Sequence, residues 1–255
     1  MNDQETLSYL NFLKESKIRL DLIPFKRLLS RLGNPHQAYP SILVGGTNGK
    51  GSIASMIAAI LIHAGFRVGL YTSPHLVDFR ERICVNGAMI SPQEAGAYIS
   101  RVRGKGEFAA TYFECLTAAA FLHFKAKQVD WAVLEVGMGG RLDATNVVSP
   151  VAAVIANISL EHRNYLGRTL REIAGEKAGI IKEKGVCLTA ATQRAVLDVF
   201  RASCKSHHAS LLQLGKDFRI RVGTNDSFSF TSSELHMKGL KVALPGTHQI
   251  KNGAL

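Results

Sequence analysis

A glycine-rich segment with a lysine and a serine, residues 42–52, carries the clearest chemistry in the sequence. Three apolar residues, Ile42–Val44, predict the end of a buried strand. Four glycines follow within seven positions, and an apolar run beginning at Ser52 predicts a helix. Backbone N–H groups in such a loop approach phosphate oxygens closely, the helix N-terminus adds partial positive charge, and Lys50 adds a full one. The segment therefore predicts a phosphate-binding loop.

This loop departs from the common P-loop pattern at two places. Val44 stands where that pattern has glycine, and Gly51 follows the lysine where it has serine or threonine, so the hydroxyl comes one position later at Ser52. The alternative is a glycine-rich turn with no ligand. Because the lysine, the hydroxyl and both flanking elements agree, we favour the phosphate site.

Three further polar residues follow predicted strands. Glu135 closes the apolar run of residues 131–134, Ser73 follows the strand of residues 68–71, and His162 follows a strand that ends at Ile158. The carboxyl ends of parallel strands share one edge of a sheet, where ligands gather. Mg²⁺ prefers oxygen ligands and bridges nucleotide phosphates. We expect these residues near the phosphate loop, although Glu135 alone would fit an ion pair and His162 alone a structural role.

Composition limits the classes of protein that fit. The chain has 255 residues, 46% of them apolar, and a formal net charge of +11. Its basic residues are dispersed, which disfavours nucleic acid and favours small anionic substrates. No apolar run reaches the roughly 18 residues of a membrane helix, and the acidic, polar N-terminus is unlike a signal peptide. Four scattered cysteines predict free thiols in a reducing compartment, so we expect a cytoplasmic protein.

The elements that position these residues alternate between strands and helices. This alternation predicts an α/β fold: a mostly parallel sheet with helices on both faces. Residues 5–32 predict two short helices. After Ala209 the pattern changes, and we expect a small antiparallel β appendage at about residues 209–244. Its four expected strands are Leu211–Leu214, Phe218–Val222, Ser227–Thr231 and Leu240–Leu244.

Several longer motifs together resemble one family. Residues 46–52, 71–76, 79–83, 135–146 and 176–180 are similar to dihydrofolate synthase/folylpolyglutamate synthase, a family of the Mur-type ATP-dependent amide ligases. The resemblance runs from about Phe25 to the end of the chain. The Mur-type loop carries its hydroxyl one residue after Lys-Gly, as this chain does. The resemblance implies a fold like the central domain of Mur ligases.

The resemblance also implies roles for individual residues. Catalytic roles would fall to Lys50, His162 and Lys177, and Lys177 matches a lysine that family members carbamylate. ATP would be bound by Thr47, Asn48, Gly49, Lys50, Gly51, Ser52, Gln249 and Asn252. One Mg²⁺ would lie at Ser52 and a second at Ser73, Glu135 and His162. The pterin substrate would contact Pro74, His75, Arg82, Phe113 and Glu114. One departure stands out: the family usually has Asp-His where this chain has Glu161-His162.

The expected activity is ATP-dependent ligation of L-glutamate to dihydropteroate or to folates through an acyl phosphate. Two alternatives stay open: a nucleotide-binding regulatory module without ligase activity, and another Mur-type ligase such as a muramyl-peptide ligase. We expect residues 1–255 to be one ATP-binding domain and a C-terminal glutamate-ligase domain to be missing, so that this chain alone folds without ligating. We also expect a monomer that binds neither nucleic acid nor a membrane.

Overall fold

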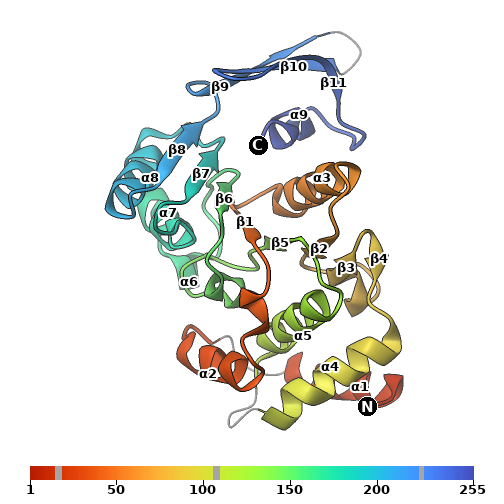
Figure 1. Ribbon diagram of the computed structural model, residues 1–255. Helices are drawn as coiled ribbons and strands as arrows, with labels where there is room; N and C mark the ends of the chain where they lie inside the picture. The colour runs from red at the N-terminus through yellow and green to blue at the C-terminus, as the bar shows by residue number, and fades with distance from the viewer. Residues whose placement is uncertain (15–18, 106–109, 224–226) are drawn as a thin grey trace. The chain divides into compact units, whose positions relative to one another are not determined.

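The computed structural model describes residues 1–14, 19–105, 110–223 and 227–255. These residues form two compact units. Unit 1 comprises Met1–Ser41, Ala58–Met138 and Leu142–Ser149, and unit 2 comprises Ile42–Ile57, Gly139–Arg141 and Pro150–Leu255. Helix α3 (Lys50–His63) begins in unit 2 and ends in unit 1 (Figure 1). Residues 15–18, inside the predicted helical stretch 5–32, lie outside the described part.

Unit 1 holds four strands of the eight-stranded sheet, in the order β4-β3-β2-β5. Strands β2 and β5 are parallel, with Val68 opposite Trp131 and Tyr71 opposite Leu134, so the loops that follow them leave from the same edge. Strand β3 pairs antiparallel with β2, and β4 pairs antiparallel with β3, so β4 is the edge strand of the sheet in unit 1. The elements of unit 1 are α1 (Asp3–Lys14), α2 (Ile23–Arg31), η1 (Pro35–Gln37), β2 (Val68–Tyr71), η2 (Phe79–Arg82), β3 (Ile83–Val85), β4 (Ala88–Met89), α4 (Pro92–Lys105), α5 (Tyr112–Ala126), β5 (Trp131–Glu135) and η3 (Ala144–Val147).

Helix α5 forms the centre of the unit 1 core. Every residue from Glu114 to Phe124 is buried. The helix begins with a capping box, in which Thr111 Oγ1 accepts from the Glu114 N–H and the Glu114 carboxylate accepts from the Thr111 N–H. Strand β2 lies close enough that a Cβ at Gly69 would come within 2.7 Å of the Phe124 ring. Burial of this helix therefore supports the strand that leads to Ser73.

Unit 2 holds the other four strands of the sheet, β1-β6-β7-β8, all parallel. Gly45 lies opposite Ile155, and Ile155 opposite Thr189, so the loops after β1, β6 and β7 share one edge. Helices α7 and α8 pack against each other beside these strands (Figure 1). The elements of unit 2 are β1 (Ser41–Gly45), β6 (Ala152–Ile155), α6 (Arg163–Leu166), α7 (Leu170–Ala178), β7 (Val186–Thr189), α8 (Arg194–Ser206), β8 (Ser210–Gln213), β9 (Phe218–Val222), β10 (Ser227–Ser232), β11 (His236–Lys241) and α9 (His248–Gly253).

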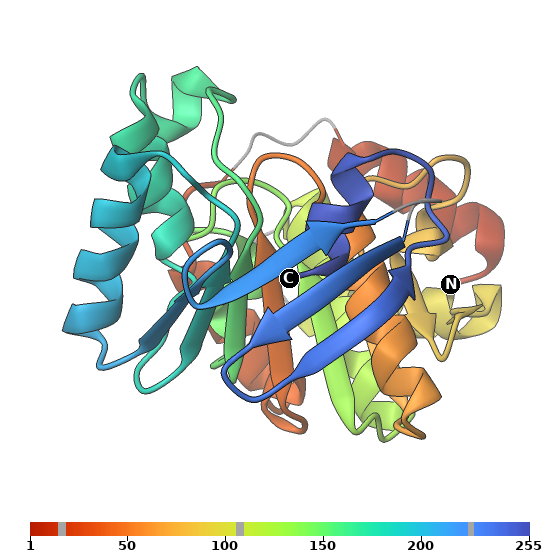
Figure 2. The same ribbon diagram turned by 90° about the horizontal axis from the view of Figure 1, so that it is seen from above.

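A separate antiparallel sheet, in the order β11-β10-β9, forms the β appendage of unit 2 (Figure 2). Phe218 and Phe228 are buried, and the Phe218 ring stacks 5.8 Å from the Phe230 ring. Helix α9 follows β11 and packs on the appendage, since a Cβ at Gly253 would come within 2.8 Å of Val242. The appendage thus supports the helix that carries Gln249 and Asn252.

The predicted mostly parallel sheet with helices and a small antiparallel appendage is confirmed, with three corrections. Residues 211–213 of Leu211–Leu214, which was predicted as part of the appendage, belong to β8, which pairs in parallel with β7 because α8 is the crossover between them. The last appendage strand is His236–Lys241 and not Leu240–Leu244. The hairpin of β3 and β4 was not predicted, because its strands are only three and two residues long.

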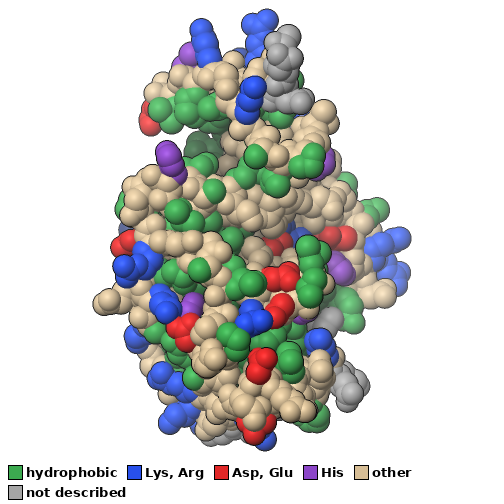
Figure 3. Space-filling view, turned by 90° about the vertical axis from the view of Figure 1, so that its right-hand side faces the viewer, with side chains coloured by type: hydrophobic (Ala, Val, Ile, Leu, Met, Phe, Trp, Pro, Cys, Tyr) green, Lys and Arg blue, Asp and Glu red, His purple; other side chains and the backbone are tan. Residues whose placement is uncertain are grey.

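On the one face seen in Figure 3, Lys and Arg side chains are interspersed with other types. No helix in the described ranges combines the length and the apolar character that crossing a bilayer requires.

Candidate functional site

The phosphate loop of unit 2 is held by the segment that follows β6. The Thr47 N–H donates to the Asn157 carbonyl at 2.8 Å, and the Asn48 N–H donates to Asn157 Oδ1 at 3.1 Å. Asn157 Nδ2 donates back to the Asn48 carbonyl at 3.0 Å. Thr47 and Ser159 also exchange hydrogen bonds through Thr47 Oγ1. These contacts give the loop a defined shape, as a preorganised anion site requires.

The side chain of Lys50 lies over its own loop. Its Nζ donates to the Thr47 carbonyl at 2.9 Å and to the Gly46 carbonyl at 3.1 Å. Lys50 and Ser52 are only partly buried and lie in the first turn of α3. A full positive charge, a helix N-terminus and a hydroxyl therefore converge at this end of the helix, which suits a phosphate group.

Helix α9 closes the other side of the loop. Asn252 and Gln249 are buried, and Asn252 Nδ2 donates to Gln249 Oε1 at 2.9 Å. Gly49 has φ +86°, and a Cβ there would lie 2.7 Å from Asn252 Oδ1. Glycine is therefore required at this position for two reasons, its backbone conformation and the approach of Asn252. The structure thus brings Gln249 and Asn252 to the predicted loop.

Lys177 also reaches the loop, from the last turn of α7. Its side chain is 2% exposed, and its Nζ donates to the Gly46 carbonyl at 2.8 Å and to Glu161 Oε1 at 2.6 Å. The Glu161 side chain is itself mostly buried. The neighbouring His162 is exposed and has φ +43°, at the start of α6. The residue that departs from the family pattern, Glu161, is thus the ion-pair partner of the predicted catalytic lysine.

In unit 1, two of the predicted metal ligands are in direct contact. The Ser73 N–H donates to Glu135 Oε2 at 2.7 Å, and Glu135 is 3% exposed. Ser73 precedes Pro74 through a cis peptide bond. The other two predicted ligands, Ser52 and His162, belong to unit 2, so the complete set stays a prediction. Within the described ranges, no three His, Cys, Asp or Glu residues form a group that could hold a metal.

Two of the predicted pterin residues, the buried Arg82 and His75, are in direct contact. Arg82 Nε donates to His75 Nδ1 at 2.8 Å, and the Arg82 guanidinium lies 5.5 Å from the centre of the Tyr112 ring. Burial lowers the pKa of His75, and the positive charges of Arg82 and Lys14 lower it further. His75 is therefore held neutral, with Nδ1 as an acceptor. This arrangement presents a cation beside aromatic surface, which suits a planar polar ring.

Phe113 lies next to this group, with its ring 5.8 Å from that of Tyr71. The Glu114 carboxylate caps α5 and lies 3.4 Å from Arg19 Nη1. Pro74 is exposed. The structure therefore brings His75 and Arg82 together and ties Glu114 to its own helix. The contact of Glu114 with a substrate stays a prediction.

Sequence reasoning missed Asn157 and Asp143. Asn157 had no signal beyond its position after a strand. Asp143 is buried, and its carboxylate accepts from Thr145 Oγ1 at 2.6 Å and from the Met138 N–H at 3.0 Å. Burial raises the pKa of Asp143 although these hydrogen bonds oppose the shift. The glycine-rich run before Asp143 was the available signal, because such a turn needs a side chain to satisfy its N–H groups.

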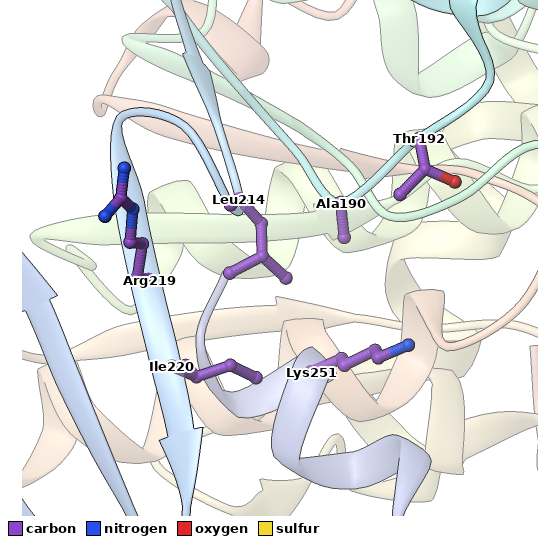
Figure 4. Close-up of a pocket in the computed structure, with 7 residues that line it drawn as sticks. Ala190, Thr192, Leu214, Arg219, Ile220 and Lys251 are labelled. Carbon is purple, nitrogen blue, oxygen red and sulfur yellow. The ribbon is translucent and has the colours of Figure 1, made fainter.

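A pocket of about 390 Å³ opens beside the appendage of unit 2 (Figure 4). It lies between the loops after β7 and β8, strand β9 and helix α9. None of the predicted site residues lines it. Six of its lining residues are labelled in Figure 4: Ala190, Thr192, Leu214, Arg219, Ile220 and Lys251.

Comparison with known proteins gives a uniform result. The family described as Mur ligase middle domain matches residues 44–255. The dihydrofolate synthase/folylpolyglutamate synthase of Bacillus subtilis (strain 168) is 39% identical over 264 residues, covering 99% of this chain and 61% of that protein. The chain therefore spans about three fifths of the length of this relative.

Solved structures give the same picture. An FPGS–AMPPCP–folate complex superposes with a TM-score of 0.94 at 35% identity, covering 100% of this chain and 65% of the other. E. coli FolC in complex with DHPP and ADP superposes with a TM-score of 0.92 at 32% identity, covering 99% and 61%. The likeness extends over the whole of this chain in both structures.

Proposed function

The chain belongs to the Mur ligase family, within its dihydrofolate synthase/folylpolyglutamate synthase branch, and on that premise we propose that it is the ATP-binding part of an enzyme that joins L-glutamate to dihydropteroate or to a folate. The observation that carries the proposal is the phosphate loop, held by Asn157, with Asn252 facing Gly49 and Lys50 over the loop. The AMPPCP–folate and DHPP–ADP complexes of similar proteins support the choice of ligands.

In the proposed reaction, a carboxylate oxygen of the pterin substrate attacks the γ-phosphorus of ATP, and the bond to the bridging oxygen of ADP breaks. The amine of glutamate then attacks the acyl carbon, loses a proton and expels inorganic phosphate, leaving an amide. The loop N–H groups and Lys50 balance the phosphate charge, and the protein otherwise contributes by holding the reactants in position.

The predicted metal ligands offer suitable donors, since a serine hydroxyl, the buried carboxylate of Glu135 and the imidazole of His162 all bind divalent cations. Mg²⁺, when bound, would neutralise charge on the transferred phosphate. Carbamylation of Lys177 stays a separate prediction. A carbamate there would place a second negative charge beside Glu161, which now pairs with the ammonium.

We propose that the folate or pteroate ring is bound by unit 1. Arg82 beside Tyr112, with neutral His75 and with Phe113 near Tyr71, offers hydrogen-bond groups and aromatic surface in one place. Pro74 lies in the same loop as His75. A ligation assay of Arg82→Ala and Arg80→Ala, each in the chain extended by the remaining C-terminal region of the B. subtilis relative, tests this. We expect a raised KM for the pterin substrate only in the first variant, because the partly exposed Arg80 pairs with Asp78.

The test of function is release of ADP and phosphate with dihydropteroate, tetrahydrofolate and a UDP-muramyl substrate assayed in parallel. We expect release that needs both glutamate and a pterin substrate. Release with the UDP-muramyl substrate alone would assign another Mur-type reaction, and nucleotide binding with no substrate-dependent release would favour a regulatory module.

Because the chain spans only part of its relatives, the assay is run in two forms. One is the 255-residue chain, and the other is the same chain extended by the remaining C-terminal region of the B. subtilis relative. We propose that ligation needs the extension, since closure of a second part over the nucleotide would exclude water and assemble the reactants. Equal amide formation by both forms would contradict this. Monomeric state and cytoplasmic location also stay predictions.

A further inference from the structure

The loop between β2 and η2 of unit 1, residues 74–78, holds two aliphatic side chains out in solvent. Leu76 is 93% exposed and Val77 is 90% exposed. Hydrophobic stabilisation is proportional to the apolar area removed from water, and these two side chains contribute almost none. Packing by these residues therefore cannot fix the shape of the loop, and polar contacts have the larger part in holding it.

One carboxylate supplies three such contacts. Glu81 Oε2 accepts from the Leu76 N–H at 2.8 Å, and Glu81 Oε1 accepts from the N–H groups of Val77 and Asp78 at 2.9 and 2.7 Å. The Glu81 N–H in turn donates to the Asp78 carbonyl at 3.0 Å, within the capping box that begins η2. Hydrogen bonds to a charged acceptor are roughly twice as strong as neutral ones. Glu81 therefore fixes the backbone of three consecutive residues.

This backbone connects directly to two residues proposed to bind the pterin ring. His75 immediately precedes Leu76, and His75 Nδ1 accepts from Arg82 Nε at 2.8 Å. Arg82 follows Glu81 in the chain, and its guanidinium lies 5.5 Å from the centre of the Tyr112 ring. Glu81 thus fastens the loop onto the segment that carries Arg82, so that the imidazole of His75 stays in contact with the guanidinium.

The residues before this loop have separate anchors. The Ser73 N–H donates to the buried carboxylate of Glu135 at 2.7 Å. The Thr72 N–H donates to the Arg82 carbonyl at 3.0 Å. Loss of the Glu81 carboxylate should therefore free residues 75–78 without releasing Ser73, which is one of the predicted metal ligands.

From these contacts we propose that Glu81 is a positioning residue for the pterin substrate: its carboxylate holds residues 76–78 so that His75 keeps Arg82 in place for the ring. This inference rests on the proposed function for the identity of the substrate. A preorganised loop loses little conformational freedom on binding, so the effect of Glu81 should be seen in substrate affinity. Turnover should change little, since Ser73 has its own anchor.

Steady-state ligation by the chain extended with the C-terminal region of the B. subtilis relative tests the proposal, with dihydropteroate and tetrahydrofolate as substrates. The variants are Glu81→Ala, which removes both carboxylate oxygens, and Glu81→Gln, which keeps one oxygen as an acceptor. The matched control is Glu172→Ala in unit 2. The Glu172 carboxylate also accepts from two backbone N–H groups at the start of a helix, those of Arg168 and Thr169, at 2.6 and 2.9 Å.

We expect Glu81→Ala to raise the KM for the pterin substrate about tenfold, while kcat and the KM for ATP change by less than about twofold. Glu81→Gln should raise the same KM about threefold, because one of the two acceptor oxygens remains. Glu172→Ala should leave the pterin KM as in the wild type.

Hydrogen–deuterium exchange of the 255-residue chain without ligand gives a readout that does not depend on turnover. The peptide that covers residues 73–79 should exchange faster in Glu81→Ala than in the wild type, because the N–H groups of Leu76, Val77 and Asp78 lose their acceptor. The peptide that covers β5 should exchange as in the wild type, since a general loss of stability would speed both peptides.

A pterin KM within about twofold of the wild type in a folded Glu81→Ala protein would overturn the proposal, as would an equal rise in Glu172→Ala. A lower kcat with an unchanged pterin KM would also overturn it, because Glu81 would then act on the chemical step. If Glu81→Ala does not fold, Glu81→Gln decides on the same measurements. Faster exchange of residues 73–79 in Glu81→Ala, beside a wild-type protein that releases no ADP with either pterin substrate, would remove the proposed function and leave the hold of Glu81 on the loop standing.

Discussion

Among single residues, we expect the charge of Lys50 to serve a ligand more than the fold. Its ammonium contacts only loop carbonyls among its hydrogen-bond partners in the described structure. We expect Lys50→Ala to abolish ATP turnover in the extended protein while shifting the melting temperature by no more than a few degrees. Turnover and thermal unfolding measured on the same preparation check this, and near wild-type turnover would mean that the loop is misassigned.

At Gly49 both the backbone conformation and the space around it require glycine. Alanine at a positive φ costs about 1–2 kcal/mol, and at Gly49 the new methyl group would also meet Asn252 Oδ1 at 2.7 Å. Gly65, with φ +92° and open space around it, isolates the conformational cost. We expect Gly49→Ala to destabilise the chain more than Gly65→Ala in urea unfolding and, unlike Gly65→Ala, to weaken nucleotide binding. Equal effects in both assays would contradict the contact with Asn252.

At the scale of elements, helices α4 and α5 are linked by an ion pair whose strength depends on pH. Glu94 has a pKa lowered from 4.5 to about 2, chiefly by the hydrogen bond from Lys127, with Ser91 contributing. The pKa of Glu94 is lower in the folded protein than in the unfolded chain. The stability that ionised Glu94 adds to the folded protein is therefore complete above about pH 4.5 and is lost as the pH falls towards 2. The pair is partly exposed, so solvent screening keeps its contribution to stability small.

We therefore expect Glu94→Gln to lower the free energy of unfolding near neutral pH and to reduce the acid loss of stability between about pH 4.5 and 2. Urea unfolding of both proteins at a series of pH values measures this. If the free energy of unfolding fell equally with pH in variant and wild type, the ion pair would not contribute to the loss of stability in acid.

Elements were predictable where local signals were strong. The apolar run of residues 131–134 and the helix expected from Ser52 correspond to β5 (Trp131–Glu135) and α3 (Lys50–His63). Strand β8 was assigned to the wrong sheet, because its exposed and half-buried residues resemble an edge strand of either kind. The partner of a short strand depends on contacts between distant segments, and these leave little trace in local periodicity.

In the site too, features set by a local segment were predictable, and features set by distant contacts were not. Lys50 and Ser52 follow from strand, loop and helix in one continuous segment. The role of Asn157 as the side chain that shapes the loop does not, because the two segments are 109 positions apart. Likewise the pairing of Glu161 with Lys177 depends on where α7 packs, which the spacing of 16 residues alone cannot give.

At the scale of the whole molecule, the net charge of +11 has a kinetic consequence. A positive protein attracts an anionic nucleotide before contact, and salt screens that attraction. We expect the association rate of ADP to fall several-fold between low salt and about 0.5 M NaCl while the dissociation rate changes little. Stopped-flow binding measures both rates, and an association rate independent of salt would show that the dispersed charge does not steer the ligand.

The wide separation in sequence of the parts that shape the phosphate loop also bears on how the protein is made. Thr47 depends on Asn157, Gly46 on Lys177, and Gly49 faces Asn252 near the last residues described. During synthesis the loop leaves the ribosome long before any of these partners, so a nascent chain cannot close it locally. Contacts this distant along the chain also slow folding. The phosphate loop would consequently mature only after the segment around residue 252 has been made, and until then the growing chain would carry an open, glycine-rich segment.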